Sequence, residues 1–136
     1  MHEDDTGMSM TKTCSTCDHD QPLACYTKNS KSRDGLEARC ITCRAHARRL
    51  SAYDLTAQAY LALGESQGWC CAICGRSQDE LTRSLVVDHA HDTGTVRGLL
   101  CHACNIGIGH FADNVNNIRH AADYVQVWKE HDESNA

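Results

Sequence analysis

Eight of the ten cysteines form four Cys-x-x-Cys pairs, and this spacing constrains the fold of the 136-residue chain more than any other feature. A two-residue spacer lets both thiolates turn toward one tetrahedral ion, so such pairs are typical of structural zinc sites. Taken in chain order, the pairs predict two four-cysteine sites: Cys14, Cys17, Cys40 and Cys43, then Cys71, Cys74, Cys101 and Cys104. We therefore expect two Zn²⁺ ions to hold two small modules, with Cys25 and Cys70 left over.

The composition agrees with metal-held modules. Aromatic residues make up 5% of the chain and the 41% counted as hydrophobic includes the cysteines, so little apolar material is available for a core. Disulfides would require an oxidising compartment, and the start Met1–Asp5 has neither the basic nor the apolar segment of a secretion signal. No run approaches the length of a membrane span. We expect a soluble cytoplasmic protein with no membrane partner.

Composition and periodicity divide the chain into five segments. Residues 1–12 and 132–136 are polar and aperiodic, as mobile tails are. Residues 13–50 form the first zinc unit, with a knuckle, a hairpin turning near Arg33-Asp34-Gly35 and a helix opening at the second cysteine pair, a layout that resembles a treble-clef finger. Residues 51–69 are expected to be a linker helix with Thr56 as its N-cap, and residues 70–131 form the second zinc unit.

A hairpin and a helix are predicted inside the second unit. The β-rich run Leu85–Val87 delivers Asp88 and His89 at its end, residues 92–94 supply turn chemistry, and residues 95–100 read as the returning strand. Residues 101–108 should then be helical. An apolar stripe at helical spacing follows, and we expect it to pack against the core of this unit rather than to form a partner groove. The stripe consists of Ile118, Ala121, Ala122, Val125 and Trp128.

The residues bracketed by the second set of cysteines have the chemistry for cutting a phosphodiester. Such hydrolysis needs an activated water, a cation to offset developing charge, and help for the leaving oxygen. His89 is the natural general base, while Asp88 and Asn105 offer hard oxygens to a divalent cation with open positions, which favours Mg²⁺ or Mn²⁺. His91 could orient the phosphate or share the role of base, or it could be a surface or turn-bonding histidine, and the sequence leaves both open.

The motif Cys71-Ala-Ile-Cys74, followed by the run from Val87-Asp88-His89 to Cys104-Asn105, resembles bacteriophage recombination endonuclease VII and related HNH nucleases. The resemblance covers about residues 55–128. It implies an α+β fold with a zinc-stabilised ββα-metal core, Asp88 and Asn105 as metal ligands, and His89 as general base. It also implies 5′-phosphate and 3′-hydroxyl products and, for a phage protein, location in the bacterial host cytoplasm. The family carries an acidic residue one helical turn beyond the Asn, where this chain has Ile108.

A basic stretch in the first unit suggests where DNA is held. The formal net charge of the chain is −5, yet residues 28–49 contain seven basic and two acidic side chains, a local net charge of +5. Binding of DNA phosphates depends on the charge near the contact rather than on the net charge of the chain, so we expect duplex or branched DNA to dock here. The residues assigned to DNA are Lys28, Lys31, Arg44, Arg48 and Arg49. A solvated structural finger is the alternative interpretation of the same stretch.

A different class of protein, a non-catalytic adaptor with two nucleic-acid-binding zinc fingers, is the alternative to a nuclease. In it Asp88, His89 and Asn105 would merely satisfy turn and helix-cap hydrogen bonds. A zinc deaminase fits less well, because it needs a Pro-Cys-x-x-Cys segment and the only proline, Pro22, precedes no cysteine pair. The sequence leaves open whether the chain is a monomer or a homodimer, and which DNA structure it acts on.

Overall fold

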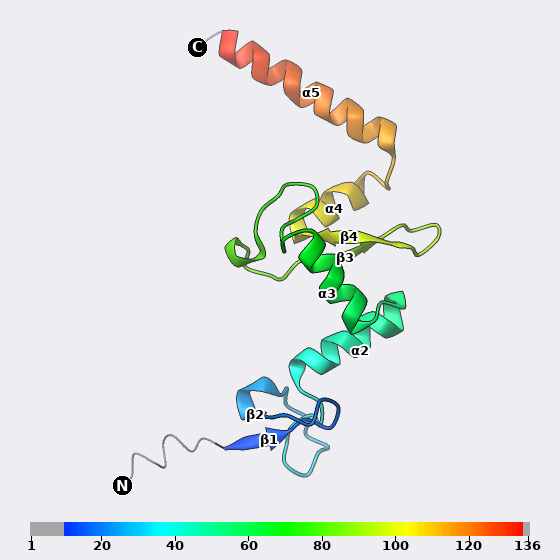
Figure 1. Ribbon diagram of the computed structural model, residues 1–136. Coiled ribbons are helices and arrows are strands. Elements are labelled where there is room, and N and C mark those ends of the chain that lie inside the picture. Colours follow the sequence, from blue (N-terminus) through cyan, green and yellow to red (C-terminus); the bar gives the residue numbers. More distant parts are fainter. Residues whose placement is uncertain (1–9, 135–136) are drawn as a thin grey trace. The chain divides into compact units, whose positions relative to one another are not determined.

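The computed structural model describes residues 10–134, and the chain divides into two compact units, Met1–Ala59 and Tyr60–Ala136. Each unit contains one two-stranded antiparallel sheet and helices (Figure 1). Each unit also contains one cluster of four cysteines. The fold is therefore a small α+β fold of two cysteine-centred modules, as expected. Residues 1–9 of the expected N-terminal tail lie outside the described residues, whereas residues 11 and 12 belong to a strand.

The sheet of the first unit consists of β1 (Thr11–Thr13) and β2 (Asp20–Pro22), which pair across the first knuckle. A short 3-10 helix, η1 (Leu23–Cys25), follows. The hairpin expected around residues 33–35 is reduced to a single bridge between Lys28 and Leu36. Its turn forms because Gly35 adopts a φ of +78°, but the short polar flanks carry no alternating apolar pattern that would extend the pairing.

Helix α2 (Ile41–Tyr53) begins directly at the second cysteine pair, as predicted, with Cys40 as its N-cap. It ends at Asp54, which adopts the left-handed conformation and donates its backbone N–H to the last turn. The small core of this unit is formed by Cys14, Tyr26 and Cys40. The Tyr26 hydroxyl donates to the Lys12 carbonyl oxygen at 2.5 Å, which ties strand β1 to this core.

Helix α3 (Ala57–Ser66) starts after Thr56, whose side-chain oxygen accepts the Ala59 N–H at 3.1 Å and so acts as the expected N-cap. This is the helix expected within the linker of residues 51–69, whose first residues, 51–53, complete α2. Gly68 and Trp69 both have positive φ and reverse the chain after α3. The Trp69 ring folds back over Gly64 so closely that a Cβ there would overlap the ring carbons.

The second sheet consists of β3 (Val86–His89) and β4 (Val96–Leu100), the hairpin predicted around the Asp-His pair. The register is regular from Val86 to Asp88 and then shifts, because His89 pairs with Val96. The buried leucines Leu85, Leu99 and Leu100 form the apolar base of the hairpin. A 3-10 turn, η2 (Gln78–Glu80), precedes it, and the Gln78 side chain accepts the Leu85 N–H.

Gln67, just beyond α3, joins that helix to the hairpin. Its amide oxygen accepts the Leu99 N–H at 2.9 Å, and its amide nitrogen donates to the carbonyl oxygens of Leu99 and Cys70 at 2.9 and 2.8 Å. One side chain thus makes the hydrogen bonds that a neighbouring strand would make to β4. The position of the hairpin in this unit is therefore fixed by a side chain 32 residues away in the sequence.

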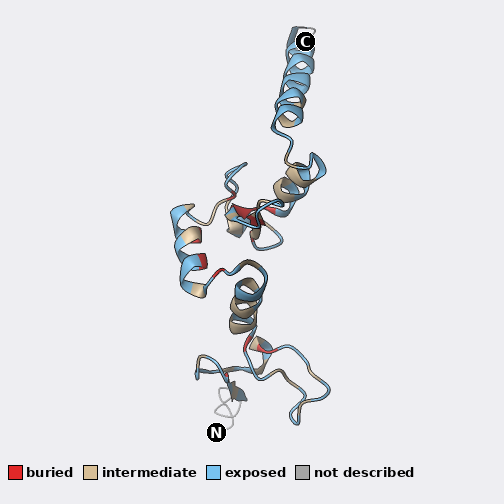
Figure 2. Ribbon diagram, turned by 90° about the vertical axis from the view of Figure 1, so that its right-hand side faces the viewer, coloured by how far each residue is buried: buried red, intermediate tan, exposed pale blue. Residues whose placement is uncertain are grey.

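Helices α4 (His102–His110) and α5 (Val115–Ser134) complete the second unit. The prediction that the apolar stripe of α5 packs against the core is wrong: Val125 and Trp128 are 50% and 54% exposed, and no described residue of α5 is buried (Figure 2). Helical periodicity specifies which face is apolar but not what covers it. Residues 132–134, expected in a tail, extend the helix. Within residues 10–134, no helix has the length and apolar character needed to cross a membrane.

Candidate metal centres and catalytic site

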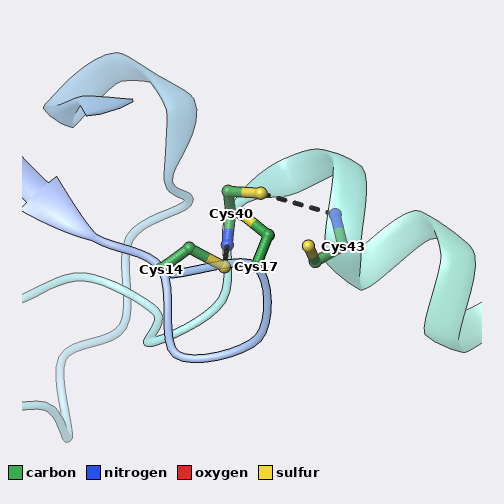
Figure 3. A group of neighbouring side chains, drawn as sticks. All are labelled: Cys14, Cys17, Cys40 and Cys43. Atoms are coloured by element: carbon green, nitrogen blue, oxygen red, sulfur yellow. Dashed lines mark hydrogen bonds between the residues drawn. The ribbon is translucent and has the colours of Figure 1, made fainter. Parts of the chain in front are cut away.

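The first cysteine cluster joins the β1–β2 knuckle to the start of α2. The four Sγ atoms of this cluster all lie within 4.8 Å of one another; they belong to Cys14, Cys17, Cys40 and Cys43 (Figure 3). The Cys14 sulfur accepts the backbone N–H groups of Cys40 and Thr16, and the Cys40 sulfur accepts the N–H of Cys43. These N–H groups offset negative charge on sulfur, as a site for a cation held by thiolates requires.

The second cluster joins the segment that follows α3 to the start of α4. The sulfurs of Cys71, Cys74, Cys101 and Cys104 also lie within 4.8 Å of one another. Cys74 and Cys101 have their sulfurs 3.8 Å apart, which matches the separation of about 3.8 Å between two ligands of a tetrahedral ion at a Zn–S distance of ~2.3 Å. Cys101 is also the N-cap of α4. Both predicted sets of four cysteines are thus brought together with the chemistry and spacing of structural zinc sites.

In both clusters the pKa of the first cysteine is lowered and the pKa of the last cysteine is raised. The backbone N–H groups of Cys17 and Cys40 lower the pKa of Cys14 to about 6 against the opposing effect of burial. Burial opposes ionisation of Cys71 too, but the N–H groups around it outweigh burial and lower its pKa to about 6. Burial and the neighbouring thiols raise the pKa of Cys43 and Cys104 to about 12.

Three of the four predicted catalytic residues, Asp88, His89 and Asn105, lie on β3 and α4, two elements that contact each other. Asp88 and His89 are the last two residues of β3, and Asp88 is buried at 7% exposure. The rings of His89 and His91 stand edge to face with centroids 5.3 Å apart, so His91 lies beside the proposed base although the strand has ended. Asn105 lies in the first turn of α4, where its N–H bonds to the carbonyl oxygen of Cys101, a cysteine of the second cluster.

Asp88 has a partner that the sequence reasoning missed. Arg97 donates Nε to one oxygen of Asp88 at 2.7 Å and Nη2 to the other at 2.9 Å, a bidentate ion pair. The same Nη2 lies 3.2 Å from Asp113 in the turn between α4 and α5, and Asp113 lies 3.6 Å from Nδ1 of His91. Hydrogen bonding to Asp88 raises the pKa of Arg97 above its already high usual value. Arg97 belongs to the motif that carries the family resemblance, whereas no sequence signal marks Asp113.

The basic stretch of the first unit is only partly gathered into one surface. Arg39, Arg44, Ala47 and Arg48 line a cleft of about 280 Å³, and Arg44 also bonds to the Thr27 hydroxyl. Arg39 was not among the residues assigned to DNA. Arg49 does not line the cleft, because its guanidinium lies 2.9 Å from Nδ1 of His46. Lys28 and Lys31 are exposed on the preceding loop.

Two curated phage proteins are similar to this chain. It is 45% identical over 80 residues to the Gene 59 protein of Mycobacterium phage D29, covering 58% of this chain and 48% of that protein. The Gene 59 protein of Mycobacterium phage L5 is 40% identical over 79 residues, covering 57% and 48%. The chain thus spans about half the length of the curated relatives it matches.

Among solved structures, the ββα-Me type II restriction endonuclease Hpy99I aligns with a TM-score of 0.41 and 27% identity over 87% of this chain and 66% of that chain. The family of recombination endonuclease VII matches residues 46–127, a segment that contains β3, β4, α4 and the whole second cysteine cluster. On the strength of that match over more than half of its residues, the chain belongs to the recombination endonuclease VII family.

Proposed function

We propose that the chain is a metal-dependent DNA endonuclease that hydrolyses phosphodiester bonds to 5′-phosphate and 3′-hydroxyl products. Its family membership supports a nuclease, and the observation that carries the proposal is the arrangement of Asp88, His89 and Asn105. The first two end a short strand, the third lies in the first turn of the helix in contact with that strand, and the second cysteine cluster includes the N-cap of this helix. A binding module has no need for this combination of groups.

His89 is the proposed general base, because an imidazole accepts a proton near neutral pH and this one lies at the end of β3 beside Asp88. His91, whose ring contacts His89, is placed to hold its orientation or to bind phosphate. Asp88 and Asn105 offer one carboxylate and one amide oxygen, a donor set that suits a hard cation with open positions. When bound there, Mg²⁺ or Mn²⁺ would supply Lewis-acid stabilisation of charge developing on the phosphate.

The two four-cysteine clusters are proposed to hold structural Zn²⁺. In the second unit this ion would fix the start of α4 relative to the segment that follows α3, and so place Asn105 through a single peptide link to Cys104. The thiol-only ligand sets leave no oxygen donor for Mg²⁺ at these positions. We therefore assign structural and catalytic tasks to different metals.

The arginine cleft on the first unit is proposed to hold the DNA backbone. Arg39, Arg44 and Arg48 present guanidinium groups around one hollow, and none of the described acidic residues lines it. One guanidinium group can donate two parallel hydrogen bonds to two oxygens of a phosphate. Such a hollow therefore suits the backbone of a DNA duplex and does not require recognition of the bases. Lys28 and Lys31 would add charge from the adjoining loop, whereas Arg49 contributes less because His46 engages it.

The adaptor without catalytic activity is kept as the second candidate, since Arg97 occupies both oxygens of Asp88 as a purely structural ion pair would. A cleavage assay separates the two. The zinc-loaded protein is incubated with supercoiled plasmid and Mg²⁺ or Mn²⁺, alongside His89→Ala and the control His120→Ala, an exposed histidine of α5. Loss of a general base slows hydrolysis by about 10²–10⁴-fold. No metal-dependent cleavage by the wild type would leave the adaptor as the better description, whereas equal cleavage rates for wild type and His89→Ala would exclude His89 as the general base.

A further inference from the structure

Both oxygens of the proposed metal ligand Asp88 are engaged by another positive group. The Arg97 guanidinium donates to Oδ2 at 2.7 Å and to Oδ1 at 2.9 Å, and the Asp88 side chain is only 9% exposed. A fork-to-fork pair of this kind uses the two lone pairs that a cation would also approach most readily. A divalent cation and Arg97 therefore compete for the same carboxylate.

The shift of strand register places Arg97 there. Asp88 pairs with Gly98 and His89 with Val96, so Arg97 is the extra residue of a β-bulge in β4. In a regular ladder Arg97 would oppose His89, and side chains of successive residues point to opposite faces, so it would lie on the face away from Asp88. The hairpin is thus shaped to bring this arginine to this aspartate.

A second carboxylate lies within reach of the same guanidinium. Asp113 accepts from Arg97 Nη2 at 3.2 Å, and it is held in the α4–α5 turn at a φ of +58° with its N–H on the Ile108 carbonyl oxygen. Arg97 can therefore leave Asp88 without losing a counter-ion. The three side chains carry a net charge of −1, and adding a divalent cation makes the group +1, which favours an anionic phosphodiester. Without Arg97 the same sum would be zero.

We infer that Arg97 is an exchangeable counter-ion: it holds Asp88 until a divalent cation takes that carboxylate, and Asp113 then retains it beside the phosphate site. Arg97 and Asp113 are positioning residues that set the metal affinity of Asp88. This inference depends on the proposed role of Asp88 as a metal ligand. It predicts opposite effects of the two residues on metal binding. Removing Arg97 removes the competitor, whereas removing Asp113 confines the guanidinium to Asp88.

The test is the Mn²⁺ affinity of the zinc-loaded full chain, measured from the EPR signal of unbound Mn²⁺. Outer partners of metal ligands change affinity by about 10–100-fold, and we expect effects of this size. Arg97→Gln should tighten Mn²⁺ binding and Asp113→Asn should weaken it. In the double variant the Asp113→Asn effect should fall below about twofold, whereas a simple through-space effect of its charge would persist. Arg119→Gln, an exposed arginine of α5, is the matched control.

A second measurement observes the Arg97 guanidinium directly. In ¹⁵N–¹H spectra of the wild-type protein, the Arg97 Nε–H resonance should shift on addition of Mg²⁺, and should not shift in Asp88→Asn. An unmoved resonance in a protein that binds Mn²⁺ through Asp88, or unchanged or weaker Mn²⁺ binding in folded Arg97→Gln, overturns the counter-ion role alone. If the Asp88→Asn variant binds Mn²⁺ as tightly as the wild type does, Asp88 is not a metal ligand. The proposed function then loses this assignment, and the inference about Arg97 fails with it.

Discussion

Replacing Gln67 by Ala should detach the catalytic hairpin from the end of α3. Gln67 is the acceptor for the N–H of Leu99, a residue with 0% exposure, and leaving a buried N–H unsatisfied costs about 1–3 kcal/mol. Two further bonds, to the carbonyl oxygens of Leu99 and Cys70, contribute about 0.5–1.5 kcal/mol each. The Leu99 carbonyl keeps a bond from the Ala72 N–H, so we expect a total loss of about 2–5 kcal/mol.

The assay is amide hydrogen exchange of Leu99 in the zinc-loaded protein, because exchange reports the free energy of opening at that site. The lower end of the expected loss corresponds to exchange about 30-fold faster than in wild type. Gln58→Ala changes an exposed glutamine of α3, the helix that precedes Gln67, and should stay within about 0.5 kcal/mol of wild type. Gln67→Glu keeps the acceptor for Leu99 but loses the donor, so an intermediate effect is expected. Leu99 protection within about threefold of wild type in Gln67→Ala would refute the assignment of Gln67 as the anchor.

Two further substitutions examine the metal and DNA sites. Cys101→Ala removes a cluster sulfur and the N-cap of α4 together. Structural zinc contributes roughly 10 kcal/mol or more to the folding of small modules, so the second unit should unfold. Zinc analysis should then show one ion lost, and circular dichroism should show the loss of structure. Retention of two zinc ions and of the wild-type melting curve would contradict this. Arg48→Ala should weaken binding to all duplex sequences alike and reduce the salt dependence of the binding constant by about one ion, as measured by fluorescence anisotropy, whereas Arg119→Ala should not. Equal salt slopes for wild type and Arg48→Ala would remove the cleft from the DNA site.

Local patterns in the sequence were sufficient for much of the second unit. The Cys-x-x-Cys spacing identified both clusters, because the two cysteines of a knuckle are close together in the sequence and therefore in space. The turn residues near Gly94 and the β-rich run before Asp88 predicted the hairpin, and Cys101 lies where the following helix begins. The positions of Asp88, His89 and Asn105 on a strand end and a helix start followed from these elements. The extent of the first hairpin did not, because one turn signal does not specify how many residues pair beyond it.

Interactions between residues far apart were decided only by the tertiary structure. Arg97 reaches Asp88 through a bulge, and a one-residue shift in register moves a side chain to the other face, which no local pattern reports. Asp113 joins them because a turn between two helices brings it there, and Gln67 meets Leu99 across 32 residues. The sequence alone determined which cysteines could share a metal ion, because the two cysteines of each Cys-x-x-Cys pair are held close together by the short stretch of chain between them. Only the folded chain decided which charge opposes each ligand, because that depends on register and on the path of the backbone between distant segments.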